Sequence, residues 1–195
     1  MGDAIMINSE SVGDPSRFRS LDELERLMAA RPGAPKDSGQ VILVVRKAEG
    51  GLRETPQRVT LEPGLGLPGD AWGRRKDRKE ATQLATMQRD VAELVANGQP
   101  LALFGDNLFL DLDLSAENLP PGSLLRLGKA LLEVTPQRHT PCSKFRARFG
   151  DEAFNFVSRE ELGHLKLRGI YLRVVERGEV KPGDPVEVVS RPAIA

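Results

Sequence analysis

The chain has 195 residues, of which 39% are hydrophobic and 29% charged, and its 28 Lys and Arg balance its 28 Asp and Glu. This composition is typical of a soluble globular protein, and its balanced charge provides no net electrostatic field that would attract nucleic acid or an anionic membrane. The lone cysteine excludes an internal disulfide, and the first ten residues carry no apolar leader. We therefore expect a cytoplasmic protein with one main domain, without nucleic-acid or membrane partners.

Residues 1–38 predict a polar segment followed by one short helix. The first 20 residues are polar, which favours loose order. Ser20 and Glu23 then match a capping box at the start of SLDELERLMAA, whose leucines share one helical face. Pro32 and Gly33 end this helix, and a polar linker follows.

Residues 39–190 alternate between short apolar stretches and turns, which predicts one mainly β domain. The helical patterns are 88–98 and part of 151–165. The expected strands are 40–47, 57–62, 81–87, 106–112, a hairpin over 123–134 that turns at Gly128, 169–178 and 185–190. Six to eight short strands with few helices predict an α+β fold built on a closed or partly closed barrel.

Two neighbouring loops carry residues suited to anion binding. GLGLPG at 64–69 matches the dinucleotide fingerprint, but Pro68 and the polar residues after it do not begin a helix. These glycines therefore predict a tight exposed loop. RRKDRK at 74–79 is either a solvated loop or an anion clamp that includes Arg75 and Arg78.

The turn at Gly105 is followed by Asp106 and Asn107. Asn107 is suited either to orienting a ligand or to tying the loop together. Asp111 and Asp113 alternate as on the outer face of a strand, and the pattern lacks the Gly and Glu of a calcium loop.

Cys142 lies in RHTPCSKF, a polar stretch at the end of a predicted strand. Residues 129–173 contain nine Lys and Arg against five Asp and Glu. Such cations favour the thiolate, the form that attacks electrophiles and binds soft metals. Two alternatives stay open at this point: an inert buried thiol, or a zinc site in which His139, His164 and a carboxylate join the thiol.

Several motifs in order resemble the MOSC domain, named after the C-terminal domain of molybdenum cofactor sulfurase. They are GLPGDAW, FGDNLFLDLDLSAENLPPGSLLRLGKALLEVTP, HTPCSKFRARFG and LRGIYLRVVERGEVKPGD, and they span about residues 40–190. The pattern is similar to that of the small stand-alone bacterial members. Pro141 replaces the Gly expected before the cysteine. The Arg-x-Pro-Cys pattern of reductase-type members is absent, because Arg138 lies one residue further back.

The resemblance implies a barrel similar to that of the pyruvate kinase β-barrel domain. It also implies a pterin-molybdenum cofactor, molybdopterin, or a sulfur atom handled at the family cysteine, which is Cys142 in this chain. In relatives that use the cofactor, that cysteine is a molybdenum ligand. The activity would be cofactor-dependent reduction or sulfur transfer, with a possible protein partner for sulfur or electrons.

The leading hypothesis places Cys142 as catalytic residue and metal ligand at the centre of an anionic-cofactor site. The cofactor-binding candidates are Arg138, His139, Thr140, Lys144, Arg148, Asp106, Asn107, Arg75, Arg78 and Arg168. The alternative is a non-catalytic β-barrel module that binds a small anion or a partner protein, in which Cys142 is only redox-sensitive.

Overall fold

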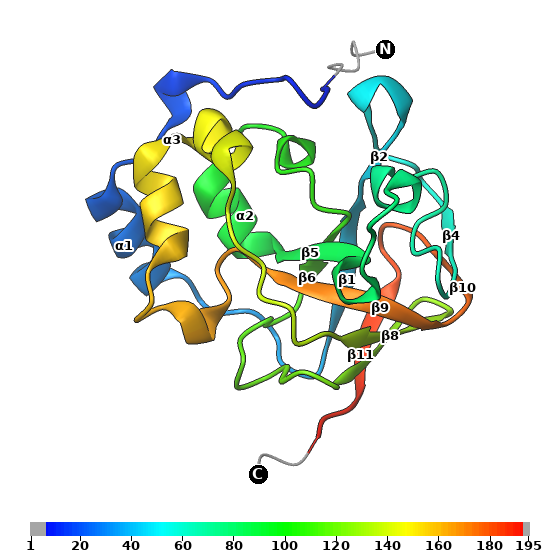
Figure 1. Cartoon of the computed structure of the whole chain (residues 1–195). Helices are drawn as coiled ribbons and strands as arrows, with labels where there is room; N and C mark the ends of the chain where they lie inside the picture. Colours follow the sequence, from blue (N-terminus) through cyan, green and yellow to red (C-terminus); the bar gives the residue numbers. More distant parts are fainter. Residues whose placement is uncertain (1–6, 193–195) are drawn as a thin grey trace.

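Seven strands close into a barrel in the computed structural model, which describes residues 7–192 (Figure 1). Their order around the barrel is β1-β11-β7-β8-β9-β5-β6, and β6 pairs with β1 to close it. Neighbours are antiparallel except for the parallel pair β5 and β6. Three α-helices gather on one side of the barrel (Figure 1). The predicted mainly β fold with some helix is confirmed.

The elements have the following bounds. The barrel strands are β1 (Ser38–Val44), β5 (Leu84–Gln88), β6 (Leu108–Asp111), β7 (Leu124–Leu127), β8 (Ala130–Val134), β9 (Ile170–Glu176) and β11 (Pro185–Ser190). Outside the barrel, β2 (Arg46–Lys47) pairs with β3 (Arg53–Glu54), and β4 (Val59–Leu61) pairs with β10 (Gly178–Val180). The helices are α1 (Leu21–Ala30), α2 (Arg89–Ala96) and α3 (Ser143–Ser158). None of the helices within 7–192 is long and apolar enough to cross a membrane.

The apolar side chains form two separate cores. One fills the barrel and includes Leu84 of β5 and Leu172 of β9. The other lies between the barrel and the helices and includes Met87 on the same strand as Leu84, together with Leu24 of α1 and Phe156 of α3. Because successive side chains of a strand point to opposite faces, β5 contributes to both cores. The helix layer thus fixes α3 against the outside of the barrel.

Two predicted strands are shorter than their apolar patterns. The stretch 40–47 divides, because β1 ends at Val44 and the chain turns into the β2–β3 hairpin, where Asp70 accepts a hydrogen bond from Lys47 N at 2.8 Å. The stretch 57–62 forms only β4, outside the barrel. The hairpin β7–β8, its turn at Gly128, and α2 are confirmed; α2 ends at Asn97, which is left-handed (φ 47°).

The N-terminal segment is ordered where the structure describes it, so the expectation of loose order is wrong for residues 7–19; residues 1–6 lie outside the described range. Gly13 N donates to Ala147 O of α3 at 3.2 Å, and Arg148 of the same helix donates to two carbonyls of the segment. These long-range contacts are invisible in a polar sequence. The capping box is confirmed, since Glu23 N donates to Ser20 Oγ and Ser20 N to Glu23.

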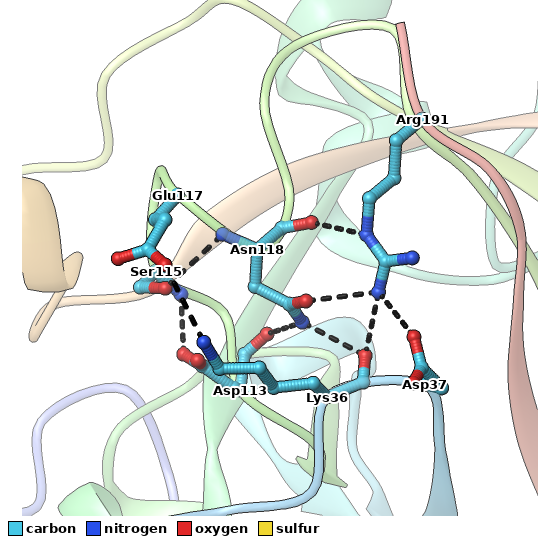
Figure 2. A network of polar contacts seen from close by, with 7 residues as sticks. All are labelled: Lys36, Asp37, Asp113, Ser115, Glu117, Asn118 and Arg191. Atoms are coloured by element: carbon cyan, nitrogen blue, oxygen red, sulfur yellow. Dashed lines mark hydrogen bonds and ion pairs between the residues drawn. The ribbon is translucent and has the colours of Figure 1, made fainter.

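A polar network joins three distant segments beside the barrel (Figure 2). Arg191, after β11, donates to Asn118 O at 2.7 Å and to Lys36 O and Asp37 Oδ1 at 2.9 Å each. Asn118 donates in turn to Lys36 O and to Asp113 O. The chain before β1, the loop after β6 and the chain after β11 are therefore held together.

Candidate functional site

The predicted site lies on a cavity of about 320 Å³. The hairpin β2–β3, the segments that lead into β5, β6 and β9, and the segment between β8 and α3 all contribute residues to it. We call it the thiol cavity. Its lining is Lys47, Arg53, Trp72, Arg75, Thr82, Ala85, Phe104, Gly105, Asp106, Asn107, His139, Thr140, Cys142, Lys144, Arg148, Arg168 and Tyr171.

Cys142 is a free thiol that lines this cavity, and it is exposed rather than buried. It is the residue that immediately precedes α3, whereas the sequence predicted a loop there and helix only beyond residue 150. Phe145 and Phe149 anchor this first part of α3 in the helix-layer core. Gly150, with φ 87° and ψ 170°, interrupts the helical backbone of α3. Because of this glycine, the sequence pattern did not predict that helix also precedes residue 150.

Asp106 and Arg168 form a buried ion pair in the wall of the cavity. Arg168 Nη1 donates to both carboxylate oxygens of Asp106, at 2.9 and 2.8 Å, and Asp106 is fully buried. Burial, the largest single influence, would raise the pKa of Asp106, but the charge and hydrogen bonds of Arg168, together with His139 and Lys47, lower the pKa overall. The carboxylate therefore stays ionised and neutralises Arg168.

His139 is a neutral imidazole packed into the same wall. Its burial, and then the charge of Arg168, lower its pKa from 6.5 to about 3. Its Nδ1 lies 3.6 Å from Asp106 Oδ1, which is longer than a hydrogen bond, and this buried nitrogen has no hydrogen-bond partner among residues 7–192. The ring packs against Tyr171, with centroids 4.4 Å apart.

A second buried network holds the opposite side of the cavity. Asp70 accepts hydrogen bonds from Lys47 N, Trp72 N and Asn107 Nδ2 at 2.8, 2.9 and 3.0 Å. Asn107 also donates to Val45 O and accepts from Lys47 Nζ and Ala85 N. Every polar atom of the Asn107 amide is thus used within the protein, which corresponds to the loop-tying role rather than to ligand orientation.

Lys47 is buried near the carboxylates of Asp70 and Asp106. Burial lowers its pKa, and the charge of Asp70, 3.4 Å from Nζ, opposes that shift. Lys47 therefore links the hairpin β2–β3 to the turn at Asn107.

Further cations face the cavity without a carboxylate partner. Arg53 lies against Gly105, since a Cβ added to Gly105 would be 2.9 Å from Nη2 of Arg53. The buried Nε of Arg53 has no hydrogen-bond partner in the described residues. Arg148 is bound to Ser11 O and Ser9 O at 3.1 and 2.8 Å, so backbone carbonyls fix its guanidinium without neutralising it. Lys144 differs, because Glu10 lies 3.0 Å from its Nζ.

Unpaired cations are concentrated around this end of the molecule. Of the 28 Lys and Arg, sixteen form an ion pair with a carboxylate within the described residues and twelve do not. Nine of these twelve line the thiol cavity, line the cavity beside it, or belong to the adjoining loop: Arg53, Arg74, Arg75, Lys76, Arg78, Lys79, Arg138, Arg148 and Lys166. A molecule with no net charge thus presents a locally positive site.

The structure brings together most of the predicted site residues. Those that line the thiol cavity are Cys142, His139, Thr140, Lys144, Arg148, Asp106, Asn107, Arg75 and Arg168. Two do not line it. Arg78 lies over the Trp72 ring, 5.7 Å from its centroid, and Arg138 lines a neighbouring cavity.

Sequence reasoning missed several residues of the cavity. Lys47 and Arg53 come from the hairpin β2–β3, where they resemble ordinary exposed strand cations, and Tyr171 begins a strand. Asp70 occurs in the quoted motif GLPGDAW, but its role as acceptor for three donors depends on contacts far away in the chain. Besides that motif, the single Trp and the single Tyr of the sequence were possible signals for this wall.

Two alternative chemistries lose support. Within residues 7–192 no group of three or more His, Cys, Asp or Glu is placed to hold a metal ion, which argues against the zinc site with His139 and His164. The loop 64–69 leads into a 3-10 helix at 71–74 rather than an α-helix, so it lacks the helix N-terminus of a dinucleotide site.

Comparisons with known proteins agree with this architecture. The chain is 36% identical over 90 residues to the uncharacterized protein YflK of Bacillus subtilis, an alignment that covers 46% of this chain and 38% of YflK. The matched part is thus well under half the length of that relative. A crystal structure titled only as that of a hypothetical protein superposes with a TM-score of 0.57 at 23% identity, covering 80% of this chain and 70% of the other.

The crystal structure of YiiM from Escherichia coli gives a TM-score of 0.51 at 24% identity, covering 80% of this chain and 72% of that one. At these identities the two structures support the fold alone. The family model described as the MOSC domain matches residues 77–187, which run from before β5 into β11 and include Cys142 and the Asp106–Arg168 pair but not Lys47, Arg53 or Arg75. The chain belongs to the MOSC domain family.

Proposed function

We propose that the thiol cavity binds a pterin-molybdenum cofactor, with Cys142 as the protein ligand of the metal. The MOSC family is associated with this cofactor, and the finer assignment depends on the residues of the cavity. The observation that carries it is an exposed lone thiol in a cavity that also presents the unpaired cations Arg53, Arg75 and Arg148.

The donor set fits a metal that arrives with its own ligands. The described residues hold no cluster of His, Cys, Asp or Glu placed to bind a free ion. A single thiolate is a soft ligand that suits a metal already held elsewhere in a cofactor. When bound, the cofactor supplies a redox-active metal centre that exchanges oxygen or sulfur with a substrate.

The cations suit the phosphate of the pterin. Guanidinium groups bind phosphate through paired hydrogen bonds, and Arg53 has a buried Nε without a partner in the described part of the chain. Arg148 is already oriented by two backbone carbonyls, so little side-chain entropy is lost when an anion binds it. These side chains would bind the phosphate, while the neutral His139 and the Asp106–Arg168 pair would shape the wall near the thiol.

The test is the cofactor content of protein purified from cells that make the cofactor. Wild-type protein is expected to contain molybdenum and pterin in similar amounts. Cys142→Ser should lose most of the metal, and Arg53→Gln with Arg75→Gln should lose most of the pterin. Arg26→Gln with Lys129→Gln is the matched control, because both residues are exposed cations that do not line the cavity. Wild-type protein without molybdenum or pterin would refute the proposal.

Sulfur transfer at Cys142 is the second candidate, because the thiol is exposed and free of protein bonds. Cyanide would remove the outer sulfur of a persulfide at this position as thiocyanate and leave the Cys142 thiolate. Wild-type protein that carries cyanide-labile sulfur but no molybdenum would favour this function over cofactor binding. The Cys142→Ser variant should then carry none.

A further inference from the structure

A second cavity, of about 210 Å³, lies beside the thiol cavity. We call it the side cavity. His139, Thr140 and Arg168 line both cavities, whereas Cys142 lines only the first. The segment from Arg138 to Pro141 therefore has a cavity on each side, and the proposed cofactor accounts for only one of them.

Part of the lining of the side cavity is apolar. Phe154 and Val157 of α3 line it together with Leu162 and Leu167 from the chain that leads into β9. Its volume is below the roughly 300–1,000 Å³ typical of sites for drug-sized ligands. Size and lining together suit a small molecule with an apolar body.

The charged residues of its lining are all cations. Arg138 and Lys166 form no ion pair within residues 7–192, and no Asp or Glu lines the cavity. Arg168, which is 7% exposed, keeps a buried Nε without a hydrogen-bond partner in the described residues. A buried guanidinium nitrogen left unpaired is costly, and an anionic acceptor nearby would offset that cost.

Lys166 is held in an unusual backbone conformation. Its φ of 51° and ψ of 43° are left-handed, and only one other non-glycine residue of the described chain, Asn97, has positive φ. Both residues end helices: Asn97 follows α2, and Lys166 follows the 3-10 helix at 163–165, where its N–H donates to Gly163 O. This cap fixes the backbone of Lys166 at a position where the residue lines the side cavity.

We infer that the side cavity binds a small monoanion with an apolar body, such as an aromatic carboxylate, through Arg138 and Lys166. The apolar body packs against Phe154, Val157 and Leu162, and the anionic group lies near the two cations. This site is additional to the cofactor site and does not require the cofactor to be bound. Its position against the shared wall makes it the place where a substrate would lie next to the centre at Cys142, a role that rests on the proposed function.

The test uses benzoate as probe and the wild-type chain of 195 residues from cells that cannot make the cofactor, so that failure of the cofactor proposal does not affect it. Benzoate is expected to shift the methyl resonances of Val157, Leu162 and Leu167 in a saturable way. Benzyl alcohol, which has the same ring without charge, should bind at least about tenfold more weakly, because it lacks the charge-assisted hydrogen bonds.

The double variant Arg138→Gln with Lys166→Asn should weaken benzoate binding by about tenfold or more, and asparagine suits the left-handed position at 166. Arg26→Gln with Lys129→Gln makes the same change in net charge at exposed positions and should bind as wild type. Equal binding of benzoate and benzyl alcohol, unchanged binding by the cavity variant, or no saturable shift of these methyl groups would each overturn the inference.

Discussion

His139 is a histidine that the protein keeps neutral. Burial, and then the charge of Arg168, lower its pKa from 6.5 to about 3, although Asp106 lies nearby and opposes the shift. Its ring contacts Tyr171 on one side and borders both cavities. At neutral pH it therefore adds no positive charge to the site, and the cations that attract an anion are the arginines and lysines.

The depressed pKa of His139 predicts a pH-dependent stability. Between about pH 6.5 and 3 the unfolded chain binds a proton at this residue and the folded chain does not. The free energy of unfolding should therefore fall as the pH is lowered through this window, by about 1.4 kcal/mol per pH unit from His139. Urea unfolding of wild type and His139→Gln from pH 7 to 4 measures this contribution as the difference between the two slopes.

The control for this prediction is His164→Gln, which removes the other histidine of the chain at an exposed position. It should keep the wild-type slope. If His139→Gln lost stability with falling pH as steeply as wild type, His139 would not be a neutral buried group in the folded protein.

Among the elements, α3 has the largest effect on the site because it begins beside the thiol and carries Lys144 and Arg148. Its N-terminal part is held on one side by the apolar contacts of Phe145 and Phe149, and on the other by the N-terminal segment at Ser9 and Ser11. The break at Gly150 changes the direction of the helix after this part. The position of Cys142 is therefore set by packing far from the RHTPCSKF motif.

The break at Gly150 predicts a specific effect of a small substitution. Gly150 has φ 87° and ψ 170°, a region open only to glycine, and a Cβ there would lie 2.8 Å from Cδ2 of Phe18. Gly150→Ala should lower the free energy of unfolding by about 1–3 kcal/mol, measured by urea denaturation. Gly73→Ala is the matched control, because its φ lies outside the left-handed range and a Cβ meets nothing within 4 Å. Equal stability of the two variants would contradict a strained break.

At the level of the whole molecule, local patterns predicted the class of fold, a closed or partly closed barrel, but not the order of its strands. Turn residues such as Gly128, and the alternation of apolar stretches, were enough to predict a hairpin and a small barrel. The parallel pairing of β5 with β6 depends on long-range register that no local pattern contains. The same limit applies to the division of 40–47 into β1 and β2, which follows from the contact between Lys47 and Asp70.

The candidate site was predictable where its residues cluster in the sequence and hidden where they do not. Residues 138–148 surround one conspicuous thiol, and Asp106 with Asn107 follows a glycine turn. Arg53, by contrast, reaches the cavity only because the hairpin β2–β3 folds over Gly105. Burial is equally invisible in sequence, and so the neutral state of His139 and the ion pair of Arg168 emerged only from the fold.

The charge distribution of the whole molecule leads to a last prediction. Most cations outside the site are paired with carboxylates, whereas Arg53 and Arg75 line the thiol cavity unpaired within the described residues. Inorganic pyrophosphate should therefore bind there, and more weakly as salt is raised, because ions screen such attraction. Calorimetric titration should show Arg53→Gln with Arg75→Gln weakening this binding by about tenfold or more, since hydrogen bonds to charged groups contribute about 1.5–3 kcal/mol each. Arg26→Gln with Lys129→Gln removes as much charge elsewhere, so an equal loss in both variants would mean that net charge, not the cavity, attracts the anion.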